Sequence, residues 1–247
     1  METIHIRFLG SGDAFGSGGR FQTCICIKTT TSMFLVDCGA SSLIAMRRFG
    51  VAPNDIDMIL LTHLHGDHFG GIPFFVLDAQ LISKRHRPLL IVGPPGTQRR
   101  VVEAMEIFFP GSSQVQQHFP LEMRELAPEH PHPLGDVIVT PYRVEHPSGD
   151  PSFALRIECQ GKIITYTGDT QWTEALLPAA SGADLLIAEA YFFEKQVKFH
   201  LDLRTLLAHL DELQPKRVIV THMSEDMLAR LEEIPCECAE DGKLIKV

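Results

Sequence analysis

The chain has 247 residues, 45% hydrophobic and 21% charged, a composition that excludes a disordered protein and allows a large core. Its 22 Lys and Arg against 31 Asp and Glu leave a formal charge of −9, which disfavours a protein that mainly tracks a nucleic-acid backbone. The close basic groupings are expected to be solvated: residues 47–48, 84–87 and 99–100. No signal-peptide pattern opens the chain and no apolar run reaches the ~18 residues of a membrane span, so we expect no membrane association and a cytoplasmic location.

The first half of the chain alternates short apolar strands with helical stretches. We expect strands at residues 4–9, 23–29, 33–37, 57–62 and 89–92. We expect helices at residues 40–49, 69–83 and 97–108. The run DMILLT at 57–62 is almost continuously apolar, which is typical of a strand buried on both faces.

Prolines interrupt the middle of the chain, so we expect residues 109–136 to be mostly loop around a strand at 121–126, and to shape the entrance of a site. Further strands are expected at residues 137–144, 152–159, 162–168, 184–188, 217–221 and 243–247, and helices at 174–180, 202–213 and 225–232. The strands come in two batches and no long linker divides them. We therefore predict a single α/β domain over residues 1–247, in which two sheets pack together with helices outside, an αββα sandwich.

The strongest chemical signal is THLHGDH at residues 62–68, directly after the buried strand. Four candidate ligands lie in it: His63, His65, Asp67 and His68. The carboxyl end of a strand is where sites in α/β proteins usually open. Imidazole and carboxylate suit zinc, with manganese, iron and cobalt as competitors. The tight spacing allows one loop to serve two metal ions, so we predict two Zn²⁺ per chain.

Three later positions repeat the same context, an apolar strand that runs into a single His or Asp. VIVTPYRVEH ends at His146, KIITYTGD at Asp169 and RVIVTH at His222. Repeated placement at strand ends predicts ligands gathered on one rim of the sandwich. Because one loop cannot close two metal sites, we expect these three residues to complete them.

In their order and spacing these seven residues resemble the metallo-β-lactamase superfamily, whose fold is a four-layer αββα sandwich. The resemblance implies that one metal is held by His63, His65 and His146, the other by Asp67, His68 and His222, and that Asp169 bridges the two. It further implies that Asp37, at the end of MFLVDCG, orients the metal loop through hydrogen bonds and is not itself a ligand.

A dinuclear site of this kind performs hydrolysis. Two cations a few Å apart bind a bridging hydroxide, lower its pKa towards neutrality and bind the oxygen of the electrophile as Lewis acids. The protein's own carboxylates cannot make such a nucleophile at neutral pH. Asp67 is accordingly expected to act in catalysis as well as in metal binding.

Two further residues resemble the tRNase Z-like branch, which includes related phosphodiesterases and arylsulfatases. In that branch a Glu from a His-Glu-Ala-Thr segment pairs with a His from a His-Ser-Thr segment, and the His stabilises the scissile phosphate or protonates the leaving oxygen. Here the segments read Ala188-Glu189-Ala190-Tyr191 and His200-Leu201-Asp202, so Glu189 and His200 persist while their neighbours differ. Helix capping alone explains Asp202.

The glycine-rich stretch at residues 10–20 resembles a loop of the same branch. Its glycines would let backbone N–H groups approach an anionic oxygen, and Arg20 would add charge, so Ser11, Gly12 and Arg20 are candidate substrate-binding residues. A plain connection between strands explains the stretch equally well.

The tRNA-maturing members usually carry a long basic arm near the segment between His146 and Asp169. This chain has 22 residues there, filled by two strands and their turn. We therefore predict no efficient tRNA 3′ processing, and a small ester or phosphodiester as substrate.

The sequence favours a phosphodiesterase and leaves other classes open. A lactone, thioester or aryl sulfate ester hydrolase would keep the same metal loop. A diiron oxidoreductase would need an additional flavin domain or partner, and we expect no such domain within these 247 residues. A non-catalytic binding protein would have little reason to keep a complete ligand set. The oligomeric state stays open, with a homodimer as one candidate.

Overall fold

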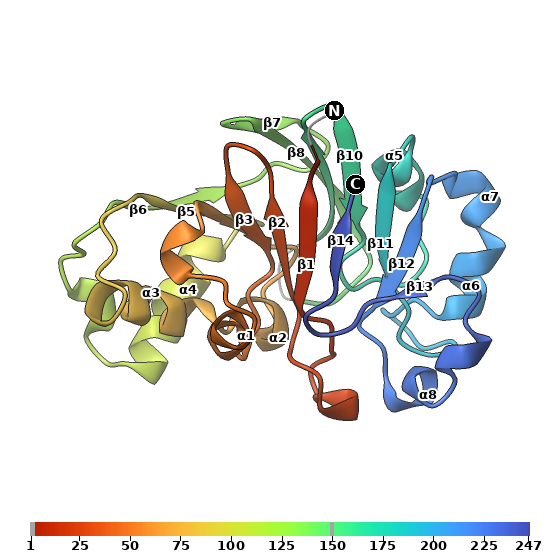
Figure 1. Cartoon of the computed structure of the whole chain (residues 1–247), viewed down its shortest axis with the longest axis horizontal. Coiled ribbons are helices and arrows are strands. Elements are labelled where there is room, and N and C mark those ends of the chain that lie inside the picture. Colours follow the sequence, from red (N-terminus) through yellow and green to blue (C-terminus); the bar gives the residue numbers. More distant parts are fainter. Residues whose placement is uncertain (1–2, 149–150) are drawn as a thin grey trace.

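Two seven-stranded sheets face each other in the computed structural model, which describes residues 3–148 and 151–247 (Figure 1). The first sheet has the order β14-β1-β2-β3-β4-β5-β6. Its strands are β1 (His5–Gly10), β2 (Cys24–Lys28), β3 (Met33–Val36), β4 (Met58–Leu60), β5 (Leu89–Gly93), β6 (Leu121–Glu125) and β14 (Leu244–Lys246).

The second sheet has the order β13-β12-β11-β10-β9-β8-β7. Its strands are β7 (His132–Leu134), β8 (Val137–Val144), β9 (Ser152–Cys159), β10 (Lys162–Tyr166), β11 (Leu185–Glu189), β12 (Val218–Thr221) and β13 (Glu237–Cys238). Strands β8, β9 and β10 form an antiparallel meander, and β10, β11 and β12 run parallel.

Helices cover the outer side of each sheet. On the first sheet lie α1 (Ser42–Arg48), α2 (Gly66–Phe69), α3 (Ile72–Leu81) and α4 (Thr97–Phe108). On the second lie α5 (Leu176–Ala180), α6 (Leu203–Ala208), α7 (Leu210–Leu213) and α8 (Glu225–Leu228). One apolar layer fills the space between the sheets and two more lie between each sheet and its helices, which confirms the predicted αββα sandwich.

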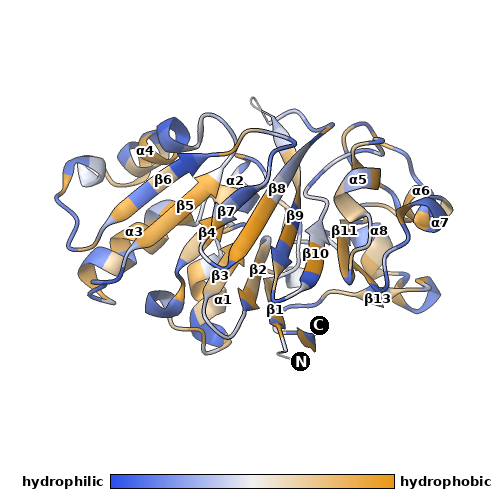
Figure 2. Cartoon of the chain, turned by 90° about the horizontal axis from the view of Figure 1, so that it is seen from above, coloured by the Kyte–Doolittle hydropathy of each residue, from blue (hydrophilic) through white to orange (hydrophobic). Residues whose placement is uncertain are grey.

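The strand pattern explains the layers. Alternate residues of β1, such as Ile6 and Phe8, point into the layer between the sheets, whereas Leu9 joins the layer under the helices. At the edge, β6 is mostly hydrophilic, which disfavours pairing with another chain (Figure 2). Within the described residues, no helix has the length and apolar character that crossing a membrane requires.

Two predicted helices differ in the structure. The helix expected at 69–83 is α3 (Ile72–Leu81), and the short α2 (Gly66–Phe69) precedes it across Gly70 and Gly71. A Cβ at Gly71 would stand 2.3 Å from the carbonyl oxygen of Gly39, so the chain passes close to another segment here. The helix expected at 202–213 is α6 and α7, interrupted at His209 (φ −104°, ψ 4°). These close approaches depend on tertiary packing, which a helical pattern does not reveal.

The strand directions define the position of the site. Strands β3, β4 and β5 are parallel neighbours, so their carboxyl ends meet at one edge of the first sheet. The parallel strands β10, β11 and β12 do the same in the second sheet. The residues predicted to bind metal follow the ends of β4, β10 and β12, except His146, which follows β8, a strand that runs in the same direction as β10.

Candidate metal centre

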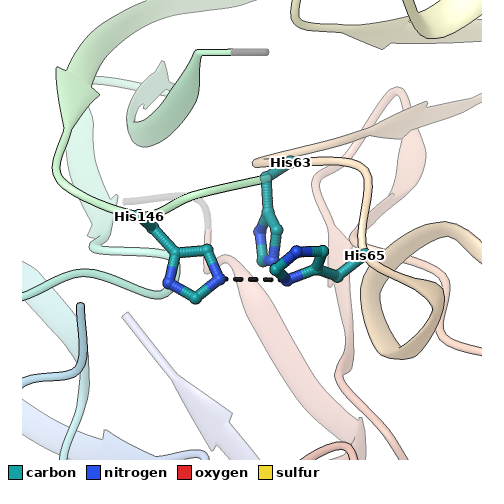
Figure 3. A group of neighbouring side chains, drawn as sticks. All are labelled: His63, His65 and His146. Carbon is teal, nitrogen blue, oxygen red and sulfur yellow. Dashed lines mark hydrogen bonds between the residues drawn. The ribbon is translucent and has the colours of Figure 1, made fainter. Parts of the chain in front are cut away.

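The first group of candidate ligands consists of three histidines, His63, His65 and His146. His63 and His65 follow β4, and His146 follows β8. The three imidazoles point towards one another, with Nε2 of His146 3.0 Å from Nδ1 of His65 (Figure 3). One nitrogen of each ring lies within 4.8 Å of the others, close enough for one metal ion.

The second group contains two histidines and two carboxylates. Nε2 of His222 lies 3.3 Å from Oδ2 of Asp67, and Nε2 of His68 lies 3.4 Å from the same oxygen. With Asp169 these residues form a set whose ligand atoms all lie within 4.8 Å of one another. All four residues are buried.

Asp169 stands between the two groups. Its Oδ2 lies 3.9 Å from Nε2 of His63 and 4.0 Å from Nε2 of His146 in the first group. Its carboxylate also lies 3.3 Å from Nε2 of His68 and 3.5 Å from Nε2 of His222 in the second. The structure therefore brings all seven predicted ligands together, in the division that the resemblance implies.

Asp37 orients the metal loop through hydrogen bonds. Its Oδ2 accepts a 2.7 Å hydrogen bond from Nδ1 of His68, which turns Nε2 of that ring towards the cluster. Its two oxygens also accept from the backbone N–H and the hydroxyl of Thr62, each at 2.8 Å. The Thr62 hydroxyl in turn lies 3.0 Å from Nδ1 of His63. One buried carboxylate thus fixes the start of the loop and two of its histidines.

The backbone is unusual where the site is built. Asp37 (φ 60°) and His222 (φ 57°) adopt left-handed conformations that non-glycine residues seldom take. Gly39 lets the chain pass close to the metal loop, because a Cβ there would stand 2.2 Å from the carbonyl oxygen of Asp67. Such strain at strand ends marks residues held in place for function.

The donor atoms fit a metal. Nε2 of His63, Nε2 of His68 and Oδ1 of Asp169 are buried without a hydrogen-bond partner, although buried polar atoms in proteins are nearly always satisfied. Burial, reinforced by the neighbouring His68, holds the pKa of His63 well below its usual range, so the ring is neutral as a ligand must be. The orphaned atoms converge on one place, and imidazole with carboxylate suits zinc.

Glu189 and His200 are also brought to this site. Glu189, fully buried at the end of β11, accepts a hydrogen bond through Oε1 from Nδ1 of His200. Its Oε2 accepts from the backbone N–H groups of Thr170 (2.9 Å) and Leu201 (3.2 Å). Burial disfavours the charged form of His200, but the hydrogen bond and charge of Glu189 outweigh it and raise the pKa of the ring.

Three contributors to the site were not predicted from the sequence. Thr62 holds Asp37, as described above. The carbonyl oxygen of Phe199, a residue with φ 71°, accepts from Nδ1 of His146 at 3.0 Å. The ring of Tyr191 lies 4.8 Å from that of His200 between centroids. A backbone carbonyl leaves no mark in a sequence, whereas Tyr191 was visible as a departure from the branch pattern next to Glu189.

The glycine-rich loop lies against the same cluster, and the polar groups of Ser11 and Arg20 are bonded to the C-terminal part of the chain. The carbonyl oxygen of Ser11 accepts from the backbone N–H of His222 at 3.2 Å. Asp241 accepts from both the N–H and the hydroxyl of Ser11, and Arg20 donates to that hydroxyl at 3.2 Å and to the carbonyl of Ala239. Gly12 permits close approach to Arg20 and Phe21. Substrate binding by Ser11, Gly12 and Arg20 stays a prediction.

The chain is similar in sequence to bacterial ribonucleases Z. It is 26% identical to ribonuclease Z of Enterococcus faecalis over 304 aligned positions, covering 98% of this chain and 95% of that protein. It is 27% identical to ribonuclease Z of Lachnoclostridium phytofermentans over 164 positions, 65% of this chain and 51% of that protein, so it spans about half the length of this relative.

Solved structures share the fold over nearly the whole chain. The metallo-β-lactamase fold protein YhfI from Bacillus subtilis superposes with a TM-score of 0.80 at 19% identity and 100% coverage of both chains. The short form of human tRNase Z superposes with a TM-score of 0.80 at 24% identity, over 98% of this chain and 98% of that one. A diphosphatase of the PhnP family superposes with a TM-score of 0.80 at 19% identity, over 99% of this chain and 98% of that one.

The sequence model described as anti-Pycsar protein Apyc1 matches residues 4–235, which is most of the chain and includes both groups of candidate ligands. The fold and the ribonuclease Z relatives agree with that match. The chain therefore belongs to the anti-Pycsar protein Apyc1 family, in the tRNase Z-like branch of the metallo-β-lactamase superfamily.

Proposed function

We propose that this chain is a dinuclear metal-dependent phosphodiesterase that hydrolyses a small or exposed phosphodiester. The observation that carries the proposal is the buried Glu189, which holds His200 at the side of the two ligand groups. A charged imidazole next to a metal cluster suits a phosphate, whose oxygens carry negative charge in the substrate and on the leaving group. A carbonyl substrate makes no comparable demand.

The residues would divide the work as follows. His63, His65 and His146 would hold one zinc ion, and Asp67, His68 and His222 the other, with Asp169 shared. Two bound cations would supply an activated water and neutralise charge on the phosphate. Nδ1 of His200 donates to Glu189, so Nε2 is the nitrogen left to donate a proton to a substrate oxygen. Asp37 and Thr62 would keep the ligand histidines oriented.

The names of the similar proteins support phosphate ester chemistry. Ribonuclease Z, tRNase Z and a diphosphatase all act on phosphoester or phosphoanhydride bonds, by their printed names. We extend the anti-Pycsar role in the family's name to this chain as part of the proposal. In cells that carry Pycsar, the wild-type protein should counteract it and a His200→Ala variant should not.

We also keep the proposal that tRNA 3′ processing is inefficient. The alignment with the Enterococcus faecalis relative extends over 304 positions, whereas this chain has 247 residues, so the relative carries inserted segments that this chain lacks. Between His146 and Asp169 the described residues are mainly β9 and β10 and their connection. Robust cleavage of a tRNA precursor by the pure protein would overturn this proposal.

The test is turnover of bis(p-nitrophenyl) phosphate by zinc-reconstituted protein. The His200→Ala variant is measured beside it, with His209→Ala as the matched control, because His209 stacks on Trp172 and belongs to none of the ligand groups. We expect hydrolysis that collapses at His200→Ala and persists at His209→Ala. No hydrolysis by a fully metallated protein would sink the proposal and favour the lactone, thioester or aryl sulfate ester hydrolases.

Two remaining classes have their own signatures. Iron in place of zinc after purification, together with a flavin partner, would point to the diiron oxidoreductase. A protein that binds metal and turns over none of these esters would be the non-catalytic class.

The homodimer also stays a prediction. The exposed apolar side chains of α3 and α4, among them Phe74, Leu81, Ile107 and Phe108, are the surface on which to test it, because exposed apolar patches often mark contacts between proteins. Sedimentation of an Ile107→Glu variant against wild type would show whether this face holds two copies together.

A further inference from the structure

A cavity apart from the metal centre lies on the outer face of the first sheet, beside the end of α1. Its volume is about 350 Å³, within the range of small-molecule sites. Three basic side chains line it, His5, Arg7 and Lys28, and its apolar side includes Phe49, Val51 and Leu244. Neither the ligand groups nor the Glu189–His200 pair takes part in it.

Two of the three basic residues of this cavity, His5 and Lys28, are directly opposed on neighbouring strands. His5 on β1 is paired with Lys28 on β2 and with Lys246 on β14, and Arg7 follows two residues later on the same face. Within the described residues, the structure gives none of the four an ion pair with a carboxylate, although the chain has an excess of acids. Asp55 is the one acidic residue in the lining.

The apolar wall is fixed in place. A Cβ at Gly242 would stand 2.5 Å from Cε1 of Phe49, so this ring packs tightly against the turn before β14. Phe21 contacts the same ring edge-on, with 6.4 Å between centroids. Gly50 (φ 69°) ends α1 beside it, with open space where a side chain would stand. The cavity is therefore formed before any ligand arrives, as in most small-molecule sites.

Cys26 forms part of the floor. The residue is 4% exposed, and burial raises the pKa of its thiol to about 12 although Arg7 and Lys28 both act to lower it. The floor is therefore uncharged, and both basic groups lie near enough to influence it. The thiol does not neutralise the charges of Arg7 and Lys28, which both line the cavity.

This cavity is remote from the metal centre. His5 and Arg7 lie near the start of β1, whereas Ser11, which contacts His222, follows its end. Ser11 is six residue steps beyond His5, which is roughly 20 Å at the usual rise along a strand. A ligand here would not reach the predicted catalytic residues.

We propose that this cavity binds an organic anion, whose phosphate-type or carboxylate head pairs with Arg7 and Lys28 and whose apolar body packs on Phe49, Val51 and Leu244. The head would replace the missing carboxylate partners of the basic row, and the body would cover an apolar wall that is otherwise open. The inference does not depend on the proposed function of the metal centre.

The test follows backbone amide shifts by NMR in the zinc-loaded protein. Four probes are titrated: octylphosphonate, octanoate, octanol and inorganic phosphate. We expect one or both of the organic anions to shift the amides of Arg7, Lys28 and Val51, and to bind more tightly than octanol or inorganic phosphate. The tighter of octylphosphonate and octanoate identifies the head group.

Two single variants link binding to the basic row. Lys28→Met removes an exposed charge, so the fold is expected to survive, and Arg7→Met removes the second. Each should weaken binding about tenfold, the size of one hydrogen bond to a charged group. Arg143→Met, on β8 of the other sheet, makes the same charge change and should leave binding unaltered.

Three results would overturn the proposal. Octanol binding as tightly as the anions would show an apolar pocket without anion selectivity. Inorganic phosphate binding as tightly as octylphosphonate would show a bare cation patch. Unshifted amides at Arg7, Lys28 and Val51 with both organic anions would show that no such site exists.

Discussion

Oε1 of Glu189 accepts a hydrogen bond from Nδ1 of His200, and the same oxygen lies 3.4 Å from Nδ1 of His222. One buried carboxylate oxygen thus stands between the proposed proton donor and a proposed metal ligand. Changes at position 189 are therefore expected to disturb both proton donation and metal binding, whereas changes at position 200 should affect proton donation alone.

Replacing His200 should separate these two effects. His200→Ala is expected to lower kcat for a diester by about 10² to 10⁴, the usual contribution of a positioned acid or base, with zinc content unchanged. Glu189→Ala should lower both kcat and zinc content. The measurements are steady-state kinetics and metal analysis on the same preparations. Loss of zinc from His200→Ala would mean that this histidine is a metal ligand.

The pH dependence of activity should reflect the Glu189–His200 pair. Burial lowers the pKa of His200, but Glu189 outweighs this effect and raises it above its usual value. The imidazolium is therefore present below the raised pKa and is lost as the pH rises through it, so activity that needs the charged ring declines on the alkaline side. Glu189→Gln should move this alkaline decline to lower pH. If the alkaline decline of kcat stays at the same pH in Glu189→Gln, a group other than His200 causes it.

Asp37 should control metal affinity without binding the metal. In Asp37→Asn the amide would face Nδ1 of His68, which now donates to Oδ2, and the ring would lose its orientation. Loss of such a supporting hydrogen bond typically lowers metal affinity about 10- to 100-fold. Competition with a chelator measures the zinc Kd, with Asp202→Asn as control, since Asp202 is a buried helix cap. Equal affinity in both variants would contradict the role of Asp37.

Zinc removal should destabilise the fold. A metal that binds the native state alone adds about 4 kcal/mol when its free concentration is 1,000 times its Kd. Chelation should therefore lower Tm, and the drop should be smaller in His146→Ala, which lacks one proposed ligand. Melting curves with and without chelator measure this difference. Identical drops in the two proteins would place His146 outside the metal site.

Much of the fold could be predicted because its signals are local. The buried strands, such as β4 and β8, carry runs of apolar residues or alternating patterns that also set their layer. The short strands β7 and β13 were missed, since three and two residues hold too little pattern, and Pro133 in β7 is tolerated only because this strand lies at the sheet edge.

The site was predictable to a different degree for each residue. The ligand histidines sit at strand ends in compact motifs, so their types and places could be inferred together. Glu189 and His200 came from resemblance, because 11 positions of irregular chain separate them and nothing local joins them. The roles of Thr62 and of the Phe199 carbonyl depend on orientations that only the folded chain defines.

Arg85 is a charged residue that is buried although it lies in a basic stretch of the sequence. The basic grouping at residues 84–87 was expected to be solvated, and for Arg85 this is wrong, because the residue is 1% exposed. Its guanidinium donates to four backbone carbonyls. Two precede β4, those of Pro53 and Ile56, and two precede β5, those of Arg87 and Pro88. Arg85→Met would remove the side-chain donor of all four carbonyls, of which only that of Pro53 keeps a backbone donor, the N–H of Ile56. At about 1–3 kcal/mol for each unsatisfied group, we expect a loss of at least ~3 kcal/mol in the free energy of unfolding.

Urea unfolding of the zinc-loaded protein measures this loss. The control is Arg124→Met on the exposed edge strand β6, where a change within about 0.5 kcal/mol is expected. Equal stability of the two variants would show that water replaces the guanidinium without cost.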